Sequence, residues 1–215
     1  MRYVRILCFV VVFAFTMITL TQAHGQGKPG SDQSAFSSAI DKEISNIENQ
    51  FVAVAEAMPE DKFDSSPENL NLPGSDFKGV RTFATQIRHV AADNFAIWAP
   101  LTGKPEPAGI NAPNGPAEMK GRAEILKFLK DSFVFAHKAV TGLTGENALG
   151  LVEFRGSKVT RISLVVLALT HINDHYGQMV EYLRMNGVAP PGSRPRMKSS
   201  IPGSSGSLGM AYQTQ

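Results

Sequence analysis

Apolar residues recur at steps of three and four along several stretches of the chain, a spacing that places them on one face of an α-helix. The first such stretch begins near Ser31 or Asp32, either of which could cap a helix, and Pro59 ends it. Its apolar positions form one continuous stripe: Phe36, Ile40, Ile44, Ile47, Phe51, Val54 and Met58. Charged residues lie off this stripe, so the pattern predicts a long amphipathic helix.

The same periodicity predicts three further helices downstream. They cover residues from about 78 to 101, from about 117 to 141, and from Ser157 or Lys158 to 185. Segments rich in glycine, proline and polar residues separate them. Residues 149–154 suggest one short extended piece, and strand signals are otherwise nearly absent. Four amphipathic helices with so little strand signal indicate an all-α fold, a four-helix bundle.

The bundle is expected to occupy residues 24–191. The last helix should stop at Asn186-Gly187, because glycine is well suited to a helix C-terminus, and Pro190-Pro191 prevents its continuation. Residues 192–215 are mostly glycine, serine, proline and basic residues with few apolar anchors. We expect this tail to be disordered.

The first 23 residues have the pattern of a secretory signal peptide. A short basic start precedes an apolar run at residues 6–20, and Thr21-Gln22-Ala23 supplies a small-residue exit. An uncleaved anchor is the alternative, since about 17–25 apolar residues can span a bilayer. The run is at the short end of that range, so we predict cleavage after Ala23 and a periplasmic or secreted protein. No later segment is apolar enough to cross a membrane.

Composition narrows the chemistry further. Cys8 is the only cysteine and lies near the start of the apolar run, so a mature chain would have neither a disulfide nor a cysteine-ligated metal. The 21 basic and 19 acidic residues are interspersed, for a formal charge of +2. No basic groove with interleaved aromatic residues is visible, so binding of nucleic acid is not expected. Any metal site must therefore use histidine, carboxylate or backbone ligands.

Two histidines of the last predicted helix, His171 and His175, are four residues apart. At about 3.6 residues per turn both rings lie on one face, close enough to share a metal ion. They share a stripe with Gln178, at the edge of the apolar face rather than in solvent. His89 occupies a matching position on the second predicted helix, in a stripe with Asp93. A bundle that places these two stripes opposite each other would bring His89 towards the pair.

Three neutral imidazoles would leave at least one position open on zinc, and more on nickel, iron or manganese. Such an ion lowers the pKa of a bound water and polarises a carbonyl, as in catalytic rather than structural sites. The competing interpretation is that these histidines are ordinary surface or core residues. A zincin protease is excluded, because Ile172 stands where that motif needs glutamate. His137 is a rival third ligand, although a buried, hydrogen-bonded histidine is the expected role, and His24 should be irrelevant.

Several motifs resemble those of the DinB/YfiT-like family of four-helix proteins. At the end of the bundle these are His171 and His175, Tyr176-Gly177-Gln178, Tyr182-Leu183-Arg184 and residues 187–191. Upstream, residues 58–62 resemble that family's exit from its first helix, and residues 86–91 resemble its second-helix histidine motif. The resemblance spans roughly residues 31–191. It implies a metal-binding bundle with a three-histidine site at His89, His171 and His175, holding a divalent ion, with zinc or nickel favoured over manganese or iron.

The resemblance also suggests activities. Family members include thiol-dependent transferases and isomerases, and many are described only as metal-dependent hydrolases. Export disfavours a thiol cofactor, because such cofactors are chiefly cytosolic, so we expect hydrolysis of an unidentified small molecule. A non-catalytic metal-binding or stress-related module and a purely structural bundle are the alternatives. Bundle faces in this family often pair, which allows a homodimer.

The neighbours of the histidines allow two roles each. Asp93 could orient the His89 ring or accept a proton, and it could equally be a solvated carboxylate. Gln178 could bind a ligand, although a structural role is favoured. Tyr182 is expected to pack with its hydroxyl at the rim, and Trp98 is expected in the core.

Overall fold

The computed structural model describes residues 29–70, 73–110 and 113–193. The predicted signal peptide lies outside the described residues, as does the predicted tail apart from Gly192 and Ser193. These two residues belong to a short 3-10 helix, η3 (Pro191–Ser193).

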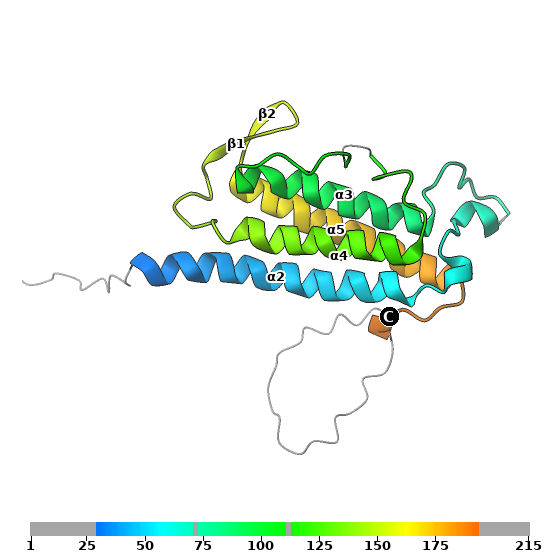
Figure 1. Ribbon diagram of the computed structural model, residues 1–215. Helices are drawn as coiled ribbons and strands as arrows, with labels where there is room; N and C mark the ends of the chain where they lie inside the picture. The colour runs from blue at the N-terminus through cyan, green and yellow to red at the C-terminus, as the bar shows by residue number, and fades with distance from the viewer. Residues whose placement is uncertain (1–28, 71–72, 111–112, 194–215) are drawn as a thin grey trace, which may run out of the picture.

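Four long helices make up most of the described chain: α2 (Pro29–Ala57), α3 (Phe83–Thr102), α4 (Arg122–Val140) and α5 (Arg161–Met185). Both α2 and α3 pack against α4 and against α5, so the helices enclose one core (Figure 1). The predicted bundle of four helices is therefore confirmed for the described residues. None of the helices described is both long enough and apolar enough to span a membrane.

A β-hairpin interrupts the all-helical pattern. Strands β1 (Leu151–Phe154) and β2 (Ser157–Thr160) pair antiparallel, with Val152 opposite Val159. The extended piece predicted near this segment is thus present, but the prediction that the last helix begins at Ser157 or Lys158 is wrong. Thr160 caps α5 by accepting a hydrogen bond from the Ser163 amide, and the helix begins one residue after that cap. Arg155 and Gly156 make the turn with φ of 49° and 79°, as two-residue hairpins require.

Two other helix starts also lie later than predicted. The second helix was expected from about residue 78, but α3 begins at Phe83, because Thr82 caps it and Gly79 has a φ of +75°. The third was expected from about residue 117, but α4 begins at Arg122. Residues 116–119 instead form a turn in which the Met119 amide donates to the Pro116 carbonyl. Amphipathic periodicity alone does not reveal these caps and turns.

Short 3-10 helices η1 (Glu60–Lys62) and η2 (Pro67–Leu70) lie between α2 and α3. The core that all four helices share contains the largest fully buried side chains, among them Trp98, Phe51, Phe83 and Phe133. Trp98 is a core residue, as the sequence suggested. Tyr182 is also buried, and its hydroxyl donates to the Arg81 carbonyl at 2.7 Å.

His137 ties α4 to α2 outside this core. Its Nδ1 lies 2.6 Å from an Asp41 oxygen and its Nε2 lies 2.9 Å from a Glu48 oxygen. The ring is hydrogen-bonded as predicted, but it is only half-buried and faces two carboxylates. Because both nitrogens are engaged there, His137 does not join the other histidines.

The stability of the bundle should depend on pH through His137. Burial alone would lower its pKa, but hydrogen bonds to Asp41 and Glu48, and their charges, raise the pKa above 6.5. A raised folded-state pKa means that these interactions contribute fully below pH 6.5 and are lost as the pH rises through the folded-state value. The unfolding free energy of wild type relative to His137→Gln should therefore fall as pH increases, measured by urea unfolding at a series of pH values. A difference that stays constant or grows with pH would contradict this assignment.

Candidate metal centre

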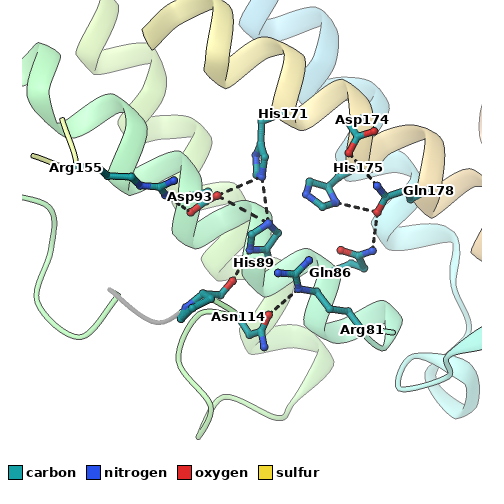
Figure 2. Close-up of polar contacts among 11 residues, drawn as sticks. Arg81, Gln86, His89, Asp93, Asn114, Arg155, His171, Asp174, His175 and Gln178 are labelled. Carbon is teal, nitrogen blue, oxygen red and sulfur yellow. Dashed lines mark hydrogen bonds and ion pairs between the residues drawn. The ribbon is translucent and has the colours of Figure 1, made fainter. Parts of the chain in front are cut away.

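Three histidine rings from two helices point into one space (Figure 2). His89 comes from α3, and His171 and His175 come from successive turns of α5. One nitrogen from each ring lies within 4.8 Å of the other two, and the Nε2 atoms of His89 and His171 are 3.1 Å apart. Two nitrogens bound to a tetrahedral zinc would lie about 3.3 Å apart, given zinc–nitrogen bonds of about 2.0–2.1 Å. The donor set and its spacing therefore fit a divalent metal ion.

Outer hydrogen bonds orient two of the rings. The Nδ1 of His89 contacts the carbonyl of Pro113, and a carbonyl can only accept, so this nitrogen carries the proton. The Nδ1 of His175 lies 3.1 Å from Gln178 Oε1. In both cases the lone pair of Nε2 is left facing the other rings, the arrangement that metal-binding histidines need.

Gln178 is itself held on both sides. Its Oε1 accepts a 2.8 Å hydrogen bond from Gln86, and its Nε2 donates to Asp174 at 2.9 Å (Figure 2). The structural role that the sequence favoured for Gln178 thus takes a specific form, the positioning of His175. His171 differs from the other two histidines, because its buried Nδ1 has no hydrogen-bond partner among the described residues.

Asp93 faces the same space as the ring nitrogens. Its Oδ2 lies 3.2 Å from Nε2 of His171 and 3.9 Å from Nε2 of His89. Its Oδ1 accepts a 2.9 Å hydrogen bond from Arg155 in the hairpin turn. The Nδ1 of His89 contacts the Pro113 carbonyl, so Asp93 is not the group that orients this ring through Nδ1. Its position suits a fourth ligand or a proton acceptor beside the metal.

All three histidines are expected to be neutral at pH 7. Burial, followed by the neighbouring His171 and His89, lowers the pKa of His175 to about 4. Burial is also the main cause that lowers the pKa of His89 and of His171. Neutral imidazole is the form that binds metal, so burial keeps these three histidines in the protonation state that an ion requires.

The loop that supplies the Pro113 carbonyl is anchored by a buried arginine. Arg88 on α3 donates to the carbonyls of Pro116 at 2.9 Å and Met119 at 3.2 Å. Gly115 permits this close approach: its φ is +67°, and a Cβ there would lie 2.8 Å from the Arg88 carbonyl oxygen. The loop is thereby fixed against α3 close to His89.

The sequence pattern indicated the three histidines and Asp93 as candidate site residues, but it did not indicate Pro113 or Arg155. A backbone carbonyl carries no signal in the sequence. Arg155 could have been found only through its hairpin, since Arg-Gly between valine-containing segments is a weak turn signal. A cavity of about 740 Å³ opens beside these groups and is lined by His89, Asp93, Pro113 and Arg155, among others. A small molecule in this cavity can therefore reach His89 and Asp93.

Comparisons with known proteins show the family and the fold of this chain. The family model of the DinB superfamily matches residues 43–179, which include all three histidines. A crystal structure of a DinB-like protein from Bacillus cereus ATCC 10987 superposes with a TM-score of 0.57 at 14% identity, covering 73% of this chain and 97% of that one. At that identity the likeness concerns the fold alone. A comparison with curated protein sequences finds no match. Since the family model covers well over half of its length, the chain belongs to the DinB superfamily.

Proposed function

We propose that this protein is an exported metal-dependent hydrolase of a small molecule, with His89, His171 and His175 holding a divalent ion, zinc or nickel. The observation that carries the proposal is the convergence of three neutral imidazoles on one space that also contains an Asp93 carboxylate oxygen. The adjoining cavity supports it, because a catalytic metal site needs access for a substrate. Export rests on the amino-terminal sequence alone.

A divalent ion at these ligands would supply Lewis acidity, lowering the pKa of water and polarising a carbonyl oxygen. The protein's own groups have separate tasks. Pro113 and Gln178 hold the His89 and His175 rings in the orientation described above. Asp93 accepts the proton of the attacking water at Oδ2, while Arg155 holds Oδ1 and so keeps Oδ2 directed at the histidines.

Asp93→Asn tests this function directly. We expect the zinc-loaded variant to bind about one equivalent of metal but to hydrolyse activated esters about 100- to 10,000-fold more slowly than wild type, because an amide does not accept the proton. Metal content and initial rates with a panel of esters, amides and phosphate esters are the measurements. Asp131→Asn, which removes an exposed carboxylate paired with Lys127, is the matched control and should leave both unchanged.

Two results would contradict the proposal in different ways. Loss of zinc from Asp93→Asn would make this carboxylate a ligand rather than the proton acceptor. Stoichiometric zinc in wild type without hydrolysis of any compound in the panel would favour the non-catalytic metal-binding module.

A further inference from the structure

The cavity beside the histidines is a groove along α3. Its floor is one face of that helix, with His89, Ala92 and Asp93 at one end and Ala96, Ala99 and Pro100 beyond them. Eleven residues separate His89 from Pro100, which corresponds to about 16 Å at 1.5 Å per helical residue. The groove is thus elongated, with His89 and Asp93 at one end.

The walls of the groove come from two segments that flank α3. Pro105, Ile110 and Pro113 from the chain after α3 line the groove, as do Phe154 and Arg155 of the hairpin. Ile110 is buried and Phe154 is half-buried, and both add apolar side chains to the lining. Lys104, Glu106 and Glu153 add charges of both signs to the lining. This distribution of residues suits a ligand with a polar head and an apolar body. The lining does not select for a particular charge at the ligand's tail.

Arg155 contributes a cation to the histidine end of the groove. It occupies the hairpin turn in the left-handed region, with a φ of 49°. In this position its guanidinium lies 5.0 Å from the Phe154 ring and binds Asp93 through one nitrogen. The other N–H groups of this 61% exposed side chain are chemically suited to an oxyanion.

We propose that the groove binds an elongated carboxylic acid derivative, whose acyl chain lies along the Ala92–Ala96–Ala99 floor and whose carboxyl-derived head reaches Arg155 and His89. This inference rests on the proposed function for the reaction at the head, but not for the binding of the chain. The substrates of the protein are then amides or esters of acids with a linear apolar chain.

Linear alkyl hydroxamates of increasing length test the groove, because their head chelates zinc and their chain probes the floor. For zinc-loaded protein we expect affinity, measured by calorimetry, to rise about two- to fourfold per added methylene, the gain expected for a partly to fully buried CH₂. Ala96→Phe fills the floor from a half-buried position and should remove this length dependence, while acetohydroxamate affinity and zinc content stay unchanged. Ala39→Phe, the same substitution at an exposed site on α2, should behave as wild type. Ala96→Leu repeats the test if Ala96→Phe does not fold.

The possible outcomes separate the groove from the metal centre. If acetohydroxamate binds but longer chains bind no better, the groove proposal is overturned and the metal centre stands. If the protein holds no zinc, linear alkanoates replace the hydroxamates as probes of metal-free protein. A length dependence that Ala96→Phe removes would then support the groove even though the proposed function had failed, and its absence would overturn both.

Discussion

His175→Ala should abolish stoichiometric binding of zinc or nickel to the protein. His175 is one of three histidines with ligand nitrogens within 4.8 Å of one another. The two imidazoles left in the variant are too few ligands to hold a divalent ion tightly. Loss of an outer partner of a metal ligand typically costs about 10- to 100-fold in affinity, so loss of the ligand itself should cost more than about 100-fold. Calorimetric titration and metal analysis after dialysis against a chelator measure the change. His89→Ala and His171→Ala should give the same result.

His137→Ala is the matched control, because this histidine lies outside the cluster and both of its ring nitrogens contact carboxylates of α2, Asp41 and Glu48. The variant should retain about one equivalent of metal with wild-type affinity. Equal loss in His137→Ala and His175→Ala would mean that the effect is one of folding and not of coordination. Retention of metal by all three single variants of the cluster would remove the proposed centre.

Phe133→Ala should cost the largest share of folding stability among simple truncations on α4. The side chain is fully buried in the core that the four helices share. Removal of a buried phenylalanine ring typically costs about 3–5 kcal/mol, as lost burial plus the cavity that remains. Chemical denaturation followed by circular dichroism gives the change in unfolding free energy.

The neighbouring residue offers a close comparison, since the Val134 side chain is 66% exposed. Val134→Ala should change the unfolding free energy by less than about 0.5 kcal/mol. A cost below about 1 kcal/mol for Phe133→Ala would mean that the helices close over the vacated space. Such a result would show that the core is less tightly defined than its burial indicates.

Periodicity was sufficient to predict the helices but not their ends. The apolar stripe of α2 predicted one continuous helix because every buried turn contributes an apolar residue, such as Ile44, Phe51 and Val54. The starts of α3 and α5 depend instead on single hydroxyl groups, those of Thr82 and Thr160. Periodicity does not distinguish such a cap from the residues upstream of it.

The candidate site was predictable to the extent that it follows from helix geometry. His89, His171 and His175 each lie at the edge of an apolar face, so packing those faces together brings the rings together, as Figure 2 shows. The contributions of Pro113 and Arg155 depend on a loop and a hairpin that return to α3 from elsewhere in the chain. Such long-range contacts leave no periodic trace in a single sequence.

The position of Trp98 offers a direct way to observe metal loading. It is the only tryptophan of the chain, it is fully buried, and it lies nine residues after His89 on the same helix, about 14 Å along its axis. An indole shielded from water emits at short wavelength, and its emission is sensitive to an open-shell ion at that range. Nickel bound at the histidines should therefore quench the intrinsic fluorescence, whereas closed-shell zinc should not. Occupancy of the centre could thus be followed optically in unmodified protein, without a dye or a substrate.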